Sequence, residues 1–185
     1  MTIQKPSKKP ADPRFSCGPT AKFPTWDPNK YDRSIVGRSH RSREARAKIR
    51  EFADRTRKLL NLPDAYRIGI KAGSDTGAVE MAMWSLLGPR PVDLFDWKAF
   101  GLDWVVDGMD ELHAPGARAF VPPYGELPDL GQYDPGHDCV FTWNGTASGV
   151  RVPNADWISD RREGLTICDA TSAIFVMDLP WKKLD

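Results

Sequence analysis

Along most of this chain of 185 residues, short apolar segments alternate with segments in which apolar residues recur with the period of a helix. Strands are expected at residues 66–70, 92–95, 118–121, 139–143 and 165–169, and helices between them at 77–87 and 102–112. Residues 122–135, rich in Pro, Gly and Asp, are expected to form a surface connection. Strands that alternate with helices in this way predict an α/β fold, with a mostly parallel, mixed sheet flanked by helices.

Proline recurs throughout residues 1–35, and because it fixes φ and lacks an N–H donor, it excludes a regular helix there. We predict an extended arm over 1–35, lying across the domain or on a second subunit, and a folded domain that begins at residue 36 and runs through 185. This domain opens with a helix at 39–60, whose apolar side chains share one face. Ser42 suits the N-cap of that helix.

The charge balance excludes two classes of partner. Lysine and arginine number 26 against 25 aspartate and glutamate residues, so no global field recruits nucleic acid or an anionic membrane. The chain lacks a signal core and a membrane-spanning apolar stretch, which predicts a cytoplasmic protein. Its three cysteines and three histidines show no ligand spacing, so we expect neither a disulfide framework nor a metal site.

The apolar run L-T-I-C at residues 165–168 ends in an acid, Asp169, which small hydroxylated residues follow. A carboxylate at the carboxyl end of a buried strand is costly unless it has a cationic partner, and α/β proteins bind their ligands at that edge. Asp169 is therefore a candidate for a cofactor site. The alternative is an acid that caps the next turn.

Residues 72–77, A-G-S-D-T-G, leave the predicted strand 66–70 and lead into the predicted helix 77–87. Backbone amides and the helix dipole at such a junction can bind a phosphate. The motif is neither a Walker A loop nor G-x-G-x-x-G, because no lysine follows and the glycine spacing differs. The alternative is that the Ser, Asp and Thr side chains only cap the helix.

The loop after the predicted strand 92–95 carries three aromatic residues beside Gly101. Phe100 is the best placed of them to stack on a flat heterocycle, because the glycine lets the backbone turn under its ring. Trp97 and Trp104 are the alternatives for that position. All three rings could instead pack in the core.

The loop after the predicted strand 139–143 places Asn144, Thr146 and Ser148 among glycines. These side chains can hydrogen-bond a ring hydroxyl or a phosphate, or form an ordinary turn. Together with Asp169, the three loops offer a phosphate cradle, an aromatic face, hydroxyl groups and a carboxylate. A flat, phosphorylated heterocycle with a basic nitrogen fits this set, and pyridoxal 5′-phosphate (PLP) is the obvious candidate.

Five segments in order carry a family resemblance: F-S-C-G-P-T, G-R-S-H-R-S, G-S-D-T-G-A-V-E-M-A-M-W-S-L-L-G, F-T-W-N-G-T-A-S-G-V-R-V-P and I-C-D-A-T-S-A. They resemble the phosphoserine aminotransferases, class-V enzymes of fold type I that use PLP. The resemblance implies that residues 36–185 are the N-terminal part of the PLP-binding large domain. It also implies a cytoplasmic homodimer that moves an amino group from glutamate to 3-phosphohydroxypyruvate, in serine and pyridoxine biosynthesis.

The resemblance also assigns roles to single residues. Arg41, with His40 beside it, matches the arginine that holds a substrate carboxylate, and the alternative is a solvated basic run. Ser74 and Asp75 match the pair at the cofactor phosphate, where backbone amides rather than the Asp75 carboxylate would make the contact. The remaining matches are Phe100 as the stacking aromatic, Thr146 near the ring hydroxyl and phosphate, and Asp169 as the catalytic acid at the pyridine nitrogen.

In this family a lysine about two dozen residues beyond the ring acid binds the cofactor covalently and moves the substrate proton. The chain ends at Asp185, 16 residues after Asp169, and Lys182 and Lys183 match positions that precede the family lysine. We therefore expect an inactive N-terminal portion: a truncated form, a frameshifted reading frame or a processed piece. Two rivals stay open, another class-V aminotransferase of the alanine- or serine-glyoxylate type, and a non-catalytic remnant that survives by binding a partner.

Overall fold

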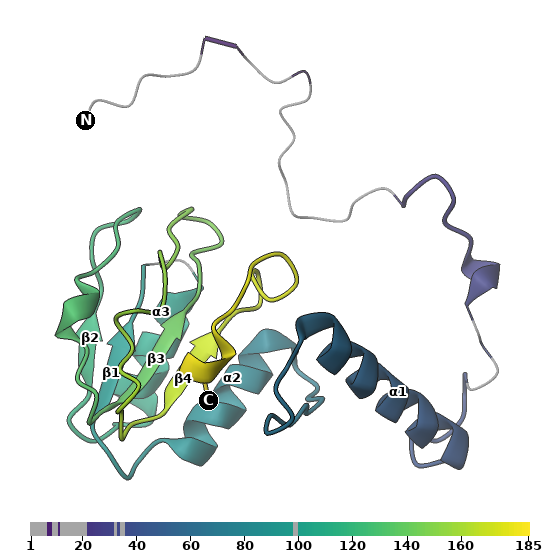
Figure 1. Cartoon of the computed structure of the whole chain (residues 1–185), viewed down its shortest axis with the longest axis horizontal. Helices are drawn as coiled ribbons and strands as arrows, with labels where there is room; N and C mark the ends of the chain where they lie inside the picture. Colours follow the sequence, from purple (N-terminus) through teal and green to yellow (C-terminus); the bar gives the residue numbers. More distant parts are fainter. Residues whose placement is uncertain (1–6, 9–10, 12–21, 32, 34–35, 98–99) are drawn as a thin grey trace. The chain divides into compact units, whose positions relative to one another are not determined.

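The computed structural model describes residues 7–8, 11, 22–31, 33, 36–97 and 100–185 (Figure 1). The chain forms two compact units, Met1–Ala47 and Lys48–Asp185. The F-S-C-G-P-T motif with Cys17, and most of the arm predicted over 1–35, lie outside the described residues. The extended arm and its boundary with the domain therefore stay predictions.

Three helices and four strands form the described part of the chain. They are α1 (Arg43–Leu60), α2 (Ser74–Leu86), β1 (Val92–Phe95), α3 (Gly101–Val106), β2 (Arg118–Phe120), β3 (Asp138–Thr142) and β4 (Thr166–Asp169). A π-helical turn, Asp107–Glu111, continues α3. Short 3-10 turns occupy three other segments: Pro28–Lys30, Leu130–Gln132 and Trp181–Lys183. The predicted α/β fold is confirmed, as are three helices and four of the five strands, with shifts of a few residues at their ends.

The first turn of α1 is closed by a side chain. The amide of Ala45 donates to the Ser42 hydroxyl at 3.2 Å, which confirms Ser42 as the N-cap. Beyond the last turn, the Arg57 guanidinium donates to the carbonyl oxygen of Pro63 at 2.7 Å. These two contacts define where the helix starts and how the chain leaves it.

The strand predicted at residues 66–70 is wrong, because this segment pairs with none of the four strands in the described part of the chain. Ile70 is 63% exposed, and the hydroxyl of Tyr66 donates to the carbonyl oxygens of Trp181 and Leu184 instead of facing a sheet. The apolar alternation is typical of a strand, but a strand also needs a neighbour with free backbone groups. Whether such a neighbour is present depends on the tertiary structure and not on the local sequence.

The four strands form one parallel sheet in the order β2-β1-β3-β4 (Figure 1). From β1 the chain crosses to β2 on one side and later returns to β3 on the other side, so the strand order reverses between β1 and β3. In open parallel sheets, ligands bind at the carboxyl ends of the strands beside such a reversal. The topology therefore predicts a site at the ends of β1 and β3.

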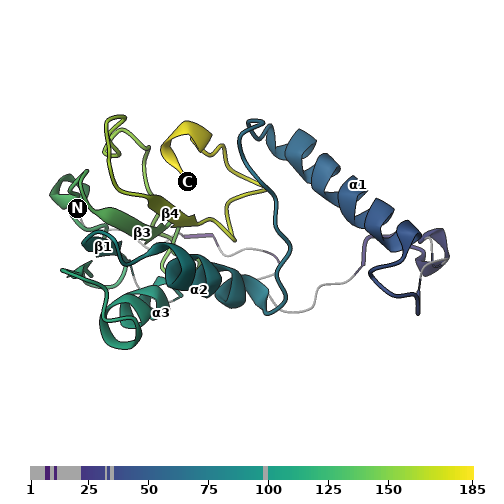
Figure 2. The ribbon, with the colours of Figure 1, turned by 90° about the horizontal axis from the view of Figure 1, so that it is seen from below.

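One face of the sheet packs against α2 and α3, which lie on the same side of it (Figure 2). The residues buried there are Met83, Val92, Leu94, Trp104, Val105, Ala114, Val140 and Ile167. Gly108 of the π-helical turn lies against Leu94, and a Cβ at this glycine would come within 2.7 Å of the leucine Cδ1. The helix expected over 102–112 is confirmed in position, and its second half is the π-helical turn Asp107–Glu111.

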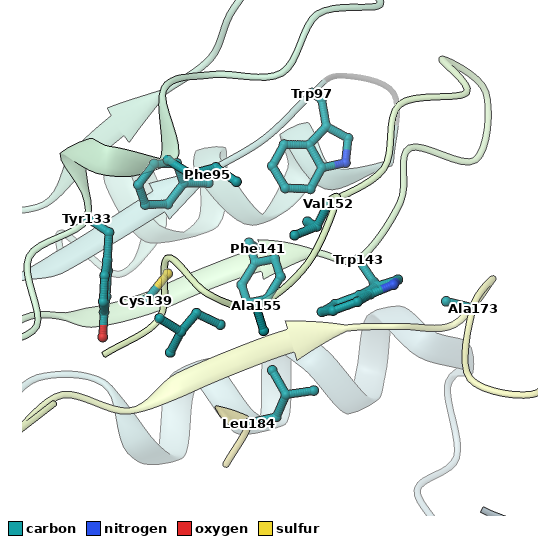
Figure 3. Packing of buried hydrophobic residues seen from close by; sticks show 12 residues of the cluster. Phe95, Trp97, Tyr133, Cys139, Phe141, Trp143, Val152, Ala155, Ala173 and Leu184 are labelled. Atoms are coloured by element: carbon teal, nitrogen blue, oxygen red, sulfur yellow. The ribbon is translucent and has the colours of Figure 1, made fainter. Parts of the chain in front are cut away.

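The opposite face is covered by connecting segments and is rich in aromatic residues. Figure 3 shows the cluster around Phe95, Phe141 and Trp143. Leu130 and Tyr133 are buried in this cluster, so the segment 122–135, which was predicted to be a surface connection, is partly core. Within the described residues, no helix is both long and apolar enough to cross a membrane.

Candidate functional site

A cavity of about 190 Å³ opens at the carboxyl edge of the sheet, beside the reversal of strand order. It is lined by Asp75, Phe100, Gly101, Thr142, Asn144, Gly145, Thr146, Asp169, Thr171 and Ser172. These residues come from the start of α2, the start of α3, and the ends of β3 and β4 with the loops that follow them. The cavity therefore collects all four chain segments in which the sequence analysis placed cofactor contacts.

Asp169 is the last residue of β4 and is 9% exposed. The Trp104 indole donates to its Oδ2 at 3.1 Å, and the amide and hydroxyl of Thr171 donate to its Oδ1 at 3.0 and 2.7 Å. No lysine or arginine is among the described residues that line the cavity. The carboxylate is thus held by neutral donors, and a ring N–H⁺ in the cavity would supply the cation that a buried acid requires.

The start of α3 lies tight against the end of β3 because residue 101 is glycine. A Cβ at Gly101 would overlap Oδ1 of Asp96 and lie 2.9 Å from Cγ2 of Thr142. Phe100 immediately precedes this helix and is 59% exposed. The glycine was expected to let the backbone turn under the ring; its observed role is close packing of the helix on the sheet.

The three candidate aromatic residues are in different surroundings. Trp97 is fully buried in the aromatic cluster on the other side of the sheet, and Trp104 is 4% exposed with its indole on Asp169. Phe100 is the one of the three that lines the cavity. Lys98 and Ala99, from the same loop, lie outside the described residues.

The loop after β3 is a tight turn that presents hydroxyl groups. The amide of Gly145 donates to Val150 at 2.7 Å, and that of Gly149 donates to the carbonyl of Gly145 at 2.9 Å. The Thr146 and Ser172 hydroxyls share a hydrogen bond of 2.5 Å across the cavity rim. This contact joins the loop after β3 to the loop after β4.

The helix α2 begins at a left-handed turn. Gly73 has φ of 111°, and Ser74 has φ of 58°, which is uncommon for a residue with a side chain. The helix thus starts three residues earlier than the sequence pattern indicated, and Asp75 in its first turn lines the cavity. Ser74 precedes Asp75 in the chain but does not itself line the cavity.

The two predicted substrate-binding residues belong to the other unit. His40 and Arg41 are exposed in the unit Met1–Ala47, and the amide of Arg41 donates to the Ser39 hydroxyl at 3.1 Å. The cavity belongs to the unit Lys48–Asp185. Their role in binding a substrate stays a prediction.

Five lining residues were not selected as site residues from the sequence: Gly101, Thr142, Gly145, Thr171 and Ser172. The D-A-T-S run contained a signal for Thr171, because a hydroxyl two residues after a strand-end acid can return to its carboxylate, as the Thr171 hydroxyl does here. Thr142 carried no such signal. Its Oγ1 is buried without a hydrogen-bond partner in the described part of the protein.

Cys168 precedes Asp169 and lies just outside the group of lining residues. Burial, followed by the negative charge of Asp169, raises the pKa of its thiol well above the ordinary value of 9.0, so the thiol is neutral. Among the described residues, no group of three or more His, Cys, Asp or Glu side chains could hold a metal ion. The side chains that line the cavity carry hydroxyl groups, one amide, one aromatic ring and two carboxylates.

Comparison with known proteins identifies relatives of this chain, although no family model matches it. The chain is 50% identical over 181 residues to phosphoserine aminotransferases from Methanosarcina mazei and Methanosarcina barkeri, and the match covers 98% of this chain and 49% of each relative. Its fold is similar to a crystal structure of PLP-bound phosphoserine aminotransferase from Trichomonas vaginalis, with a TM-score of 0.63 at 19% identity over 81% of this chain and 43% of that one. The chain spans about half the length of the curated relatives it matches. The resemblance to the phosphoserine aminotransferase family, which the motifs predicted, is thereby confirmed over almost the whole of this chain.

Proposed function

We propose that the cavity binds PLP and that this chain is part of a phosphoserine aminotransferase, which moves an amino group from glutamate to 3-phosphohydroxypyruvate. One observation carries the proposal: the carboxylate of Asp169 lines a cavity that is also lined by Phe100 and by the first turn of α2. The relatives at 50% identity support this choice of reaction.

The donors around the cavity fit a phosphorylated pyridine. The first turn of α2 has backbone N–H groups without helical partners, which is the usual way in which a helix binds a phosphate. The hydroxyls of Thr146 and Ser172 line the same cavity, and the buried Oγ1 of Thr142 has no partner among the described residues. The residues present therefore match both ends of the cofactor: donors for its phosphate and an acid for its nitrogen.

Four of the lining residues then have distinct roles. When bound, the cofactor supplies an electron-poor ring that accepts the electrons of the substrate Cα–H bond. Asp169 would keep the proton on the ring nitrogen, because a carboxylate stabilises a neighbouring positive charge. Phe100 would cover one ring face and exclude water, and Thr146 would donate to the ring hydroxyl or the phosphate. The backbone amide of Asp75, rather than its carboxylate, would face the phosphate.

We further propose that Arg41, with His40 beside it, orients the substrate carboxylate, because a guanidinium binds a carboxylate through two parallel hydrogen bonds. Residues 36–185 would form the N-terminal part of the large domain, in a cytoplasmic homodimer. The product would serve serine and pyridoxine biosynthesis.

Binding of pyridoxamine 5′-phosphate tests the cofactor proposal, because this amine cannot react with surface lysines as an aldehyde would. The 185-residue chain should bind one equivalent in a calorimetric titration, and pyridoxamine without the phosphate should bind at least tenfold more weakly. Asp169→Ala should weaken binding by at least tenfold with the circular dichroism spectrum retained. Absence of saturable binding, or full binding by the Asp169→Ala variant, would overturn the proposal.

The reaction is tested separately, in the natural protein that contains this chain. Formation of 2-oxoglutarate from glutamate should require 3-phosphohydroxypyruvate as the acceptor. Turnover with glyoxylate and none with the phosphorylated acceptor would instead identify the alanine- or serine-glyoxylate type. Arg41→Ala should raise KM for glutamate more than it lowers kcat, because the arginine contacts a group that does not react.

A further inference from the structure

Asp169 has both carboxylate oxygens occupied by donors from two different elements. The indole of Trp104 in α3 donates to Oδ2 at 3.1 Å. The amide and hydroxyl of Thr171 donate to Oδ1 at 3.0 and 2.7 Å. A carboxylate has about four acceptor positions, so these three bonds define its orientation and leave about one position for a ligand.

Thr171 is a local partner, but Trp104 is not. Thr171 follows Asp169 by two residues and forms a turn that an acid of this kind adopts in many loops. Trp104 is 65 positions away in the sequence and reaches Asp169 because α3 packs against the sheet. The orientation of the Asp169 carboxylate therefore depends on where α3 packs, because the Trp104 indole is part of that helix.

The helix that carries Trp104 is held at both ends. At its start, Gly101 leaves no space between α3 and Thr142, and beyond its end Gly108 leaves none against Leu94. The Trp104 ring itself is 4% exposed and lies in the cluster that fills this face of the sheet. The indole N–H therefore has little freedom to leave Oδ2 of Asp169.

Phe100 lies four residues before Trp104, at the start of the same helix. Residues four apart in a helix lie on one side, one turn from each other. The segment thus brings both rings to one site: the exposed ring of Phe100 lines the cavity, and the buried indole of Trp104 contacts Asp169, which lines the same cavity.

We propose that Trp104 is a positioning residue: its indole N–H holds Asp169 so that the free position of the carboxylate faces the nitrogen of a pyridine ring stacked on Phe100. This inference rests on the proposed function and extends it. Trp104 touches neither cofactor nor substrate in this assignment. It acts through Asp169, and α3 couples the stacking face of the site to its acid.

The test compares pyridoxamine 5′-phosphate with its 1-deaza analogue, in which a C–H replaces the ring nitrogen. The wild-type 185-residue chain should bind the pyridine at least tenfold more tightly than the analogue, because only the pyridine pairs with Asp169. Trp104→Phe removes the N–H and should reduce this ratio by about tenfold, as expected when a hydrogen bond to a charged group is lost. Trp84→Phe is the matched control, because Trp84 lies on α2, is 48% exposed and does not line the cavity.

A second variant separates positioning from packing. Site-specific replacement of Trp104 by 3-benzothienylalanine keeps the ring shape and removes only the N–H, so the fold should be retained even where Trp104→Phe unfolds. The binding ratio should fall in this variant too. A ratio that stays unchanged, including the case in which both ligands lose affinity equally, would overturn the role of Trp104. A wild-type chain that binds neither ligand, or both equally, would instead refute the assignment of the cavity to PLP.

Discussion

Asp93 of β1 and Arg118 of β2 are partners in the register of the parallel sheet and form a two-pronged ion pair, with Nε–Oδ1 and Nη2–Oδ2 distances of 2.8 and 2.7 Å. The carboxylate is fully buried, and it also accepts from the amide of Asp134 and contacts Nδ1 of His137, each at 2.9 Å. Burial acts to raise the pKa of Asp93, but these partners outweigh it and the pKa lies below its ordinary value of 3.8. The folded state therefore favours the ionised acid.

Asp93 should make the stability of the chain depend on acid pH. Its contribution is complete above the unfolded pKa of 3.8 and is lost as the pH falls through the lower folded value. Asp93→Asn should reduce the free energy of unfolding by about 2 kcal/mol at pH 7, the scale of a hydrogen bond to a charged group. Urea unfolding of both proteins between pH 7 and pH 2.5 measures this, and the difference should shrink below about pH 4. A difference that stays constant over this range contradicts the prediction.

Tyr66 should produce the opposite dependence at alkaline pH. Burial, and then the negative charge of Asp185, raises the pKa of its phenol above 10.0, so the stability it contributes is complete below pH 10 and is lost as the pH rises through the folded value. Tyr66→Phe removes the bonds to the Trp181 and Leu184 carbonyls and should cost about 1 kcal/mol at pH 7. Thermal unfolding from pH 8 to pH 11 measures the effect. Tyr124→Phe is the control, because Tyr124 is 60% exposed, and an equal loss there would argue against a specific role of Tyr66.

The strands that hold the site could be predicted because each is a short apolar run with clear ends. Residues 92–95 were predicted as a strand and form β1 with the same bounds, all four residues being buried. Asp169 was predicted at a strand end because its apolar run stops abruptly, and it is the last residue of β4. In both cases the necessary information is local.

Other features depend on contacts between distant segments. The run at 66–70 has the alternation of a strand but no partner in the described sheet. The indole that holds Asp169 comes from 65 positions away, and aromatic content alone could not distinguish Trp104 from Phe100. The π-helical turn is joined to β1 by the close contact of Gly108 with Leu94. A single sequence does not determine such pairings, because each depends on where another element packs.

Gly101→Ala should destabilise the domain although alanine favours helices. Alanine gains about 1 kcal/mol over glycine inside a helix. Its methyl group would overlap the Asp96 carboxylate and crowd Thr142, and overpacking of this kind costs about 1–3 kcal/mol. We therefore expect a net decrease in the free energy of unfolding measured with urea. Binding of pyridoxamine 5′-phosphate should also weaken, because α3 is displaced. Gly69→Ala is the matched control, because nothing lies within 4 Å of a Cβ there, and it should be neutral or stabilising.

Phe100→Ala should weaken binding of pyridoxamine 5′-phosphate by about fivefold, equivalent to about 1 kcal/mol for the loss of one aromatic stacking contact. Phe100→Trp should retain binding, because an indole offers the same flat face. The ring is 59% exposed, so neither substitution should change the free energy of unfolding by more than about 0.5 kcal/mol. Phe175→Ala is the matched control, because Phe175 is 65% exposed and does not line the cavity. Calorimetric titration of the three variants measures these effects. Equal affinity of the Phe100→Ala variant and the wild-type chain would exclude Phe100 as the stacking residue. Equal losses of affinity in Phe100→Ala and Phe175→Ala would show that the effect is not specific to the cavity.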